Sequence, residues 1–330
     1  MTSRREFIVG AGVAAIGAAL PIDRLDRLAE AFAPPLYPPI DLSYFDTPIT
    51  PALSDIRFGY AAITWGGDDR QAIEDVAAAG FRGIQLRTSV LKEFGDKPAA
   101  LKELLAEHRL VMTAFSSGNV SIDPAQESKT IDEHMKNAQF VSDVGGMYLQ
   151  VTDTKPKDRA VTPADCARLG RIMTEIGKRT AELGIPLGYH NHMNNIGEKP
   201  DDVDRVLAAA DPRFVKLELD VAHYLQGGGD PVKAIRQYKD RLLFLHVKDV
   251  QSPVPGAVDG KPAYRFVELG RGKVDLPGVF AALRDVKFRG WAVVELDAVP
   301  DNANTPKESA LISKKYLEQH GYDVQAVGSY

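Results

Sequence analysis

The sequence predicts a single α/β domain folded as a closed (β/α)8 barrel, and three observations lead to this prediction. From residue 58 onward, short apolar segments rich in β-branched and aromatic residues alternate with longer amphipathic segments of helical period. There are eight such units, the number at which a parallel sheet of this kind closes. Several of the apolar segments end in Asp, His or Glu, which is typical of the carboxyl-terminal mouth of a barrel.

The expected elements follow one another in strict alternation. The predicted strands cover residues 58–64, 83–87, 111–116, 147–151, 186–190, 215–219, 242–247 and 291–296. The predicted helices cover residues 70–79, 98–107, 128–144, 163–183, 201–209, 231–238, 276–283 and 306–319. Proline opens several of these helices, where its missing N–H is harmless, and glycine follows several of them. An open dinucleotide-binding sheet is the alternative, but no Gly-x-Gly-x-x-Gly follows the first strand.

The N-terminal residues predict export rather than a place in the barrel. Ser3-Arg4-Arg5-Glu6-Phe7 leads into an uncharged run of about 14 residues that is rich in Gly and Ala and resembles a twin-arginine signal. A membrane-spanning helix needs about 20 residues, so no stable membrane anchor is expected. An ordinary N-terminal helix with a chance Arg pair is the alternative. The expected location is periplasmic or secreted.

The chain then divides into four expected parts. Residues 1–33 form the signal, with a plausible cleavage site at Ala31-Phe32-Ala33, and the proline-rich residues 34–56 form a linker. The barrel is expected over residues 57–322 and a C-terminal tail over residues 323–330.

Composition excludes several classes of protein. The 330 residues are 44% hydrophobic, which is enough for a full core, and the formal net charge is −5. The Lys and Arg residues form no basic stripe, so nucleic acid is not an expected partner. Cys166 is the only cysteine, which excludes an internal disulfide. The expected partner is a small-molecule carbohydrate, and homo-oligomerisation stays open.

Three strand ends carry metal-binding side chains. They are Asp220 in Leu219-Asp220-Val221-Ala222-His223, His246 in Leu245-His246-Val247-Lys248-Asp249, and Glu295 in Val294-Glu295-Leu296-Asp297. Because the ends of parallel strands share one mouth, we expect Asp220, His246 and Glu295 to converge on a divalent ion.

Each of these residues also has a structural interpretation. A lone His on an apolar strand is commonly a core residue, and Glu295 could pair with a Lys inside the barrel. Glu218 shares a strand face with Asp220, and a salt bridge to a buried Lys or Arg is an equal alternative for it. Lys248, on the face of His246, is expected to stabilise an oxyanion or to pair with an acid.

The fifth predicted strand ends in Tyr189-His190-Asn191-His192-Met193, followed by Glu198. His190 and His192 are two residues apart, so both can point into the mouth. One could bind the metal while the other contacts substrate, and the spacing does not decide between them.

Together these motifs resemble the xylose-isomerase-like TIM-barrel family of sugar phosphate isomerases and epimerases, which also contains inosose dehydratases. The matching motifs are Asp220-x-x-His223, His246-x-Lys248-Asp249, Leu269-Gly270-Arg271-Gly272 with Val274-Asp275, and Glu295-x-Asp297. The run from Tyr189 to Met193 with Glu198 is most similar to the inosose dehydratase and keto-sugar branch.

The resemblance implies a divalent metal, Mn²⁺, Co²⁺, Mg²⁺ or Zn²⁺, held by Asp220, His246 and Glu295. Many members have metal-binding Glu residues on the second and fifth strands, where this chain has Gln85 and the pair of histidines. The fourth ligand is therefore expected to be His192, with Glu198 next. The remaining expected site residues are His190, Glu198, His223 and Lys248 for catalysis, and Tyr189 and Arg271 for substrate binding.

The expected function is that of an isomerase or epimerase acting on a sugar or keto-sugar through a metal-stabilised enediolate. A lyase or dehydratase acting on a keto-glycoside or inosose by β-elimination is the first alternative, and a noncatalytic sugar-binding barrel is the second. The predicted export favours an unphosphorylated substrate. A metal-dependent endonuclease on the same barrel is disfavoured because the chain is acidic.

Overall fold

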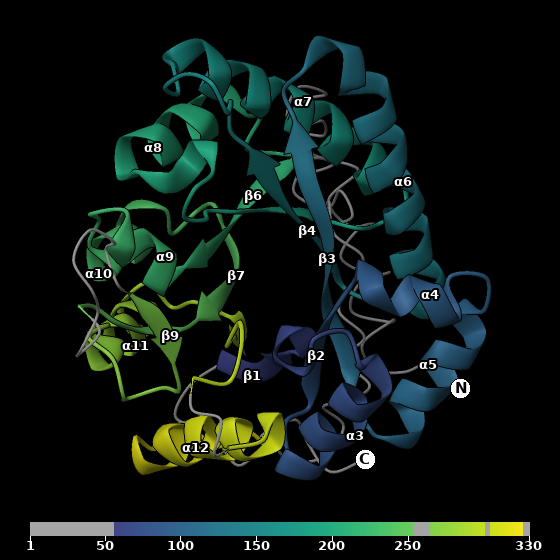
Figure 1. Ribbon diagram of the computed structural model, residues 1–330, viewed down its shortest axis with the longest axis vertical. Helices are drawn as coiled ribbons and strands as arrows, with labels where there is room; N and C mark the ends of the chain where they lie inside the picture. The colour runs from purple at the N-terminus through teal and green to yellow at the C-terminus, as the bar shows by residue number, and fades with distance from the viewer. Residues whose placement is uncertain (1–55, 254–263, 301–303, 326–330) are drawn as a thin grey trace, which may run out of the picture. The chain divides into compact units, whose positions relative to one another are not determined.

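The computed structural model describes residues 56–253, 264–300 and 304–325. Eight parallel strands close into a barrel in the order β1-β10-β7-β6-β5-β4-β3-β2 (Figure 1). Their bounds are β1 (Ile56–Ala61), β2 (Gly83–Arg87), β3 (Val111–Ser121), β4 (Tyr148–Thr154), β5 (Leu187–His190), β6 (Val215–Asp220), β7 (Leu242–Val247) and β10 (Gly290–Val294). The predicted (β/α)8 fold is confirmed.

All eight predicted helices are present on the outside of the barrel (Figure 1). They are α3 (Asp69–Ala79), α5 (Pro98–Glu107), α6 (Glu127–Val144), α7 (Pro163–Glu182), α8 (Pro200–Ala209), α10 (Pro231–Gln237), α11 (Leu276–Asp285) and α12 (Pro306–Gln319). Five of the eight have proline as their first residue. Helix α7 also has a capping box, in which Thr162 and Asp165 satisfy each other's backbone N–H groups.

The structure differs from the sequence prediction mainly at the carboxyl ends of strands. Strand β1 stops at Ala61, and residues Ala62–Trp65 form the 3₁₀ helix η2 instead of continuing the strand. The short helix α9 (Val221–Gln226) directly follows β6. An antiparallel pair, β8 (Asp249–Gln251) and β9 (Arg265–Val267), lies between β7 and α11 and was not predicted, because three-residue strands leave no periodicity to detect.

The predicted signal, residues 1–33, lies outside the described residues, as does the linker up to residue 55. Ile56, the last residue of the predicted linker, is the first residue of β1. At the other end Val324 is 1% exposed, so the predicted tail begins inside the packed structure. Within the three described ranges, no helix is long and apolar enough to cross a membrane.

The barrel interior is divided into an apolar floor and a polar mouth. Phe244, Trp291 and Val293 belong to one buried apolar cluster. Alternation along β7 and β10 places these residues on the same faces as His246 and Glu295, which follow them toward the carboxyl ends. The polar side chains of the mouth therefore stand on a layer that excludes water from below.

Candidate active site

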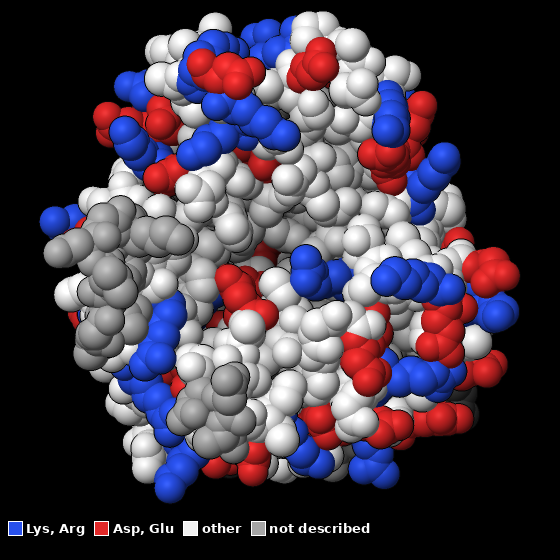
Figure 2. All heavy atoms as spheres, viewed as in Figure 1, with Lys and Arg blue, Asp and Glu red and all other residues white. Residues whose placement is uncertain are grey.

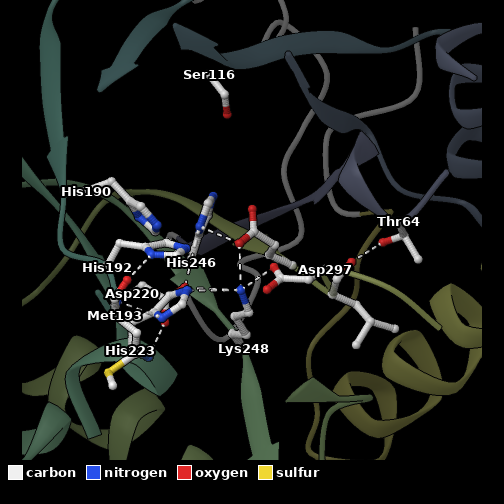
Figure 3. Close-up of polar contacts among 12 residues, drawn as sticks. Thr64, Ser116, His190, His192, Met193, Asp220, His223, His246, Lys248 and Asp297 are labelled. Carbon is white, nitrogen blue, oxygen red and sulfur yellow. Dashed lines mark hydrogen bonds and ion pairs between the residues drawn. The ribbon is translucent and has the colours of Figure 1, made fainter. Parts of the chain in front are cut away.

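The three residues expected to converge on a metal ion do lie together. His246 Nδ1 is 3.3 Å from Glu295 Oε1 and 3.7 Å from Asp220 Oδ2. Asp220 ends β6, His246 is the penultimate residue of β7, and Glu295 directly follows β10. All three side chains are buried at the mouth of the barrel (Figure 3). The expected convergence is therefore observed, and each residue comes from the end of a different strand.

His190, from the end of β5, joins this group. Ligand atoms of His190, Asp220, His223 and Glu295 all lie within 4.8 Å of one another. His190 also forms such a group with Glu218 and His246, and a third with His192 and His223. A set of imidazole nitrogens and carboxylate oxygens at this spacing suits a divalent ion such as Zn²⁺ or Mn²⁺.

Unsatisfied polar atoms indicate where a cation would fit. Among the described residues, several buried atoms have no hydrogen-bond partner, and four of them lie at this site without an ion pair shorter than 3.3 Å: His190 Nδ1, Glu218 Oε2, Asp220 Oδ2 and His246 Nδ1. Each such atom would ordinarily cost about 1 to 3 kcal/mol. Their concentration at one place is explained if they surround a positive charge.

The orientation of His246 supports the same conclusion. Its Nε2 lies 2.8 Å from Gln85 Oε1 and 2.6 Å from Glu218 Oε1. Gln85 Oε1 accepts the proton on Nε2, so Nδ1 is the nitrogen that faces the carboxylates of Asp220 and Glu295. Two carboxylates this close to Nδ1 favour a positive charge there, either a proton on Nδ1 or a metal ion that Nδ1 binds in its place. The residues present therefore fit a divalent metal ion.

The buried acids also stabilise a positive charge at this site. Burial lowers the pKa of His246, but Glu218 and Glu295 raise it by more, so the net pKa lies well above the ordinary value. Burial raises the pKa of Glu218 to about 7, an effect that His246 partly opposes. Glu218 therefore pairs with His246 and not with the Lys or Arg that the sequence analysis considered as its partner.

Lys248 is a fully buried cation beside the proposed metal ligands. Its Nζ lies 2.6 Å from Asp297 Oδ1, 2.9 Å from Glu295 Oε1 and 3.3 Å from His223 Nε2. It also lies 3.9 Å from the centre of the Phe266 ring, a residue of the unpredicted strand β9. Burial lowers the pKa of Lys248, but Glu295 and Asp297 raise it further, so the side chain is an ammonium at neutral pH.

His192 and His223 lie close together, with their rings tilted by 37°, and they have opposite proton positions. Their ring centroids are 3.8 Å apart. The backbone N–H of Met193 donates to His223 Nδ1, which places the ring proton of neutral His223 on Nε2, 3.9 Å from Asp220 Oδ2. His192 Nδ1 is 2.7 Å from the Met193 carbonyl oxygen and donates to it, which leaves a lone pair on Nε2. Burial and Lys248 hold the pKa of His223 well below its ordinary value.

A cavity of about 270 Å³ opens at the mouth beside these residues. Figure 2 shows the hollow near the middle of the view, with acidic side chains at its edge. His190, His192, His246, Glu295 and Asp297 line one part of the cavity. Polar side chains from β3 and β4 line another part.

Three residues expected in the site are placed elsewhere. The buried Tyr189 donates its hydroxyl to Asp153 Oδ2 at 2.8 Å, because alternation turns it away from the face that holds His190. Glu198 Oε2 accepts from the backbone N–H of Asn194 and from Lys155. Arg271 pairs with Glu268 at 3.1 Å. The described residues that line the mouth cavity do not include Tyr189, Glu198 or Arg271.

Sequence reasoning missed two residues that orient the site. Gln85 stands out in the sequence only as a departure from the family, yet it accepts from His246 and donates to Ser116 Oγ at 2.9 Å. A polar residue between Ile84 and Leu86 in an apolar strand was the signal that could have revealed it. Phe266 gave no such signal, because β9 is too short to show a pattern.

Asp153 anchors the segment that carries His192, and it makes stability depend on pH. Its carboxylate is fully buried and accepts from Tyr189 Oη and from the Ile196 N–H at 2.6 Å. Burial raises the pKa of Asp153 from 3.8 to about 6. The carboxyl therefore loses its proton at a lower pH in the unfolded chain than in the folded protein, and the free energy of unfolding should fall by about 2 kcal/mol as the pH rises from 4 to 6.5.

Replacing Asp153 by Asn removes this dependence of the free energy of unfolding on pH. Relative to the wild type, we expect the free energy of unfolding of D153N to gain about 2 kcal/mol as the pH rises from 4 to 6.5, measured by urea unfolding at both values. Asp240, whose side chain is 85% exposed, provides the control D240N, for which no such change is expected. A difference between D153N and wild type that does not change with pH would contradict this account of Asp153.

Fold and site together define a (β/α)8 barrel with a buried carboxylate and histidine cluster, suited to a divalent metal, at its carboxyl-terminal mouth. The chain belongs to the xylose isomerase-like TIM barrel family, whose model matches residues 73–317. The family expected from the motifs is thereby confirmed.

Individual relatives are more distant. An inosose dehydratase of Lacticaseibacillus casei is 28% identical over 298 residues, which cover 80% of this chain and 96% of the relative. The structure of the IOLI protein with a bound zinc atom aligns with a TM-score of 0.67 at 17% identity, over 83% of this chain and all of that one. The D-allulose 3-epimerase of Methylomonas sp., in complex with D-allulose, aligns with a TM-score of 0.64 at 20% identity, over 81% and 97% of the two chains.

Proposed function

We propose that this protein is a divalent-metal-dependent dehydratase of keto-inositols or related keto-sugars. It would remove the proton next to the ketone and expel the hydroxyl group on the following carbon. The observation that carries the proposal is the convergence of His190, Asp220 and Glu295, with His246 Nδ1 facing both carboxylates, beside the closely spaced rings of His192 and His223. The 28% identity to an inosose dehydratase over nearly its whole length supports the same substrate class.

Asp220, His246, Glu295 and His190 would hold the metal. When bound, a divalent ion in such a site draws electron density from a substrate carbonyl and makes the neighbouring C–H more acidic. We prefer His190 to His192, the ligand chosen from sequence, because His190 belongs to all three groups of closely spaced ligand atoms and His192 to only one. The zinc atom bound by the IOLI protein, which has the same fold, is consistent with this choice of cofactor class.

His192 and Lys248 would move the protons. His192 Nε2 has a lone pair and lines the cavity, so it would accept the proton from the substrate carbon. Lys248 Nζ lies 2.9 Å from Glu295 and 2.6 Å from Asp297, both of which line the cavity, and 3.3 Å from His223 Nε2. The ammonium would donate a proton to the departing hydroxyl, which leaves as water.

The sequence analysis expected epimerisation or isomerisation first. The geometry of the site favours elimination instead. Epimerisation needs a proton donor on the face of the substrate carbon opposite the base. The centroids of the His192 and His223 rings are 3.8 Å apart, and Lys248 Nζ lies 3.3 Å from His223 Nε2, so the base His192 and the acid Lys248 lie on the same side of the site. Elimination in which the proton is removed and the hydroxyl is protonated from one face requires base and acid on the same side. The twin-arginine signal predicted in residues 1–33 favours an unphosphorylated substrate.

Metal analysis combined with incubation in deuterated water tests this proposal. We expect about one divalent ion per chain, loss of activity on chelation and release of water from an inosose, followed by the appearance of the enone chromophore. Substrate recovered before completion should contain deuterium next to the ketone. A metal-free protein with full activity would refute the proposal. A deuterated product with inverted configuration and no loss of water would replace the dehydratase by an epimerase.

A further inference from the structure

The wall of the mouth cavity formed by β3 and β4 is built of neutral hydrogen-bonding side chains. Ser116, Asn119, Gln150 and Thr152 all line it. The Ser116 hydroxyl is directed toward the side of the mouth that holds His190 and His246 (Figure 3), and Gln85 links Ser116 to His246. We infer that this wall binds the hydroxyl groups of an uncharged sugar or cyclitol ring, with Asn119 and Thr152 as the specificity-determining pair. This inference rests on the proposed function and names residues that the proposed chemistry does not use.

The backbone of β3 is reshaped to bring Asn119 to the mouth. The register with β4 shifts between Ser116 and Asn119, and Gly118 has φ +96°. This region of φ is open to glycine and costly for residues with a side chain. The irregularity breaks the strict alternation of the strand, so that Ser116, Gly118 and Asn119 all line the cavity.

A buried network holds this irregular segment from behind. Ser117 points toward α6, where its Oγ lies 2.6 Å from His134 Nδ1 and accepts from Asn137 Nδ2 at 2.9 Å. Ser117 and His134 are 7% and 2% exposed. The proposed chemistry assigns no role to these three residues, and their position directly behind Gly118 explains them as positioning residues for the wall.

The hydrogen bonds of the wall leave donors directed at the cavity. Thr152 Oγ1 donates to Asn119 Oδ1, which fixes the orientation of the amide. Asn119 Nδ2 is then the part of the amide left to donate to a ligand. Ser116 Oγ accepts from Gln85 Nε2, so its own proton is also left for a ligand. Donors fixed in place by protein partners suit the hydroxyl oxygens of a sugar.

Charge and size narrow the ligand further. The described lining of the cavity contains one Arg, the exposed Arg87 at the end of β2, and the two acids Glu295 and Asp297. A phosphate is ordinarily held by several N–H groups and cations, and it would be repelled by these acids. The cavity of about 270 Å³ lies at the lower end of the range of small-molecule sites, which suits one ring better than two.

The inference is tested with the metal-loaded full chain and the non-reactive probe myo-inositol, by calorimetric titration. We expect N119A to weaken binding by about 3- to 15-fold, the range for one neutral hydrogen bond, and to raise KM for the inosose similarly with kcat within threefold. T152V should act in the same direction, and S117A should give a smaller effect of the same sign. Gln139 lies on the exposed side of α6, so Q139A is the matched control.

Several results would overturn the inference. They are unchanged binding and KM in N119A and T152V, an N119A effect confined to kcat, failure of the wild type to bind myo-inositol, or tighter binding of glucose 6-phosphate than of glucose. The metal content of every sample is measured in parallel. An unloaded wild type would show that the metal-site proposal has failed, whereas a loaded wild type with an insensitive wall would show that only the present inference has failed.

Discussion

Replacing Glu295 by Gln is expected to abolish tight metal binding and to lower activity on the order of 10³-fold. Glu295 Oε1 faces both His246 Nδ1 and Lys248 Nζ, at 3.3 Å and 2.9 Å. Burial is the largest single effect on the pKa of Glu295, and it raises the pKa. His246 and Lys248 together lower it by more, so the net pKa lies well below the ordinary value. The carboxylate of Glu295 is therefore ionised, and the neutral amide of Gln cannot replace its charge.

The metal-free protein should respond to the same substitution in a second way. Without the negative charge of Glu295, the buried ammonium of Lys248 keeps Asp297 at 2.6 Å and the more distant Asp220 at 4.0 Å as its charged partners. We expect the free energy of unfolding of metal-free E295Q to fall by about 1 to 3 kcal/mol, the range for a hydrogen bond to a charged group. Dialysis against a metal buffer followed by elemental analysis gives the metal affinity, and urea unfolding gives the stability.

Asp297 provides the control for this experiment. It contacts Lys248 but is not among the groups of closely spaced ligand atoms in the described chain. D297N should therefore keep its metal. If D297N lost the metal as completely as E295Q, the effect of E295Q would be attributed to Lys248 and the assignment of Glu295 as a ligand would fall.

The sequence was sufficient to predict the barrel and the convergence of Asp220, His246 and Glu295, for a physical reason. Buried parallel strands must be apolar along most of their length, so a strand such as Leu242–Val247 is visible as a run, and His246 stands out from it. Once closure is inferred, residues at carboxyl ends must share one mouth. No knowledge of loop conformation is needed to bring Asp220, His246 and Glu295 together.

The residues that sequence reasoning misplaced lie where alternation is broken or hidden. Tyr189 is expected at the substrate because it adjoins His190, but neighbouring residues on a strand face opposite sides. Arg271 follows β9, a three-residue strand without a detectable period, and pairs with Glu268 rather than with anything in the cavity. Asn119 escaped notice because the shift in register after Ser116 cannot be inferred from the order of side chains.

The division of labour between His190 and His192 is the sharpest remaining prediction, because the same substitution should have different effects at two positions two residues apart. We expect H190Q to lower metal affinity by on the order of 100-fold or more, with activity restored in part by excess metal. His190 is buried, and burial and His246 hold its pKa well below the ordinary value, so it presents a neutral nitrogen. A neutral imidazole is the form that binds a metal.

H192Q is expected to keep its metal and to lose catalysis. Its Nε2 lone pair is the proposed proton acceptor, and general-base removal costs about 10²- to 10⁴-fold. The deuterium exchange rate next to the ketone should fall with kcat, while metal content and KM stay within a few-fold of the wild type, and excess metal should not restore the rate. The reverse pattern, with H192Q empty of metal and H190Q loaded but inactive, would return the fourth ligand to His192. The proton acceptor would then be His190, whose Nδ1 lies 3.8 Å from Glu218 Oε1.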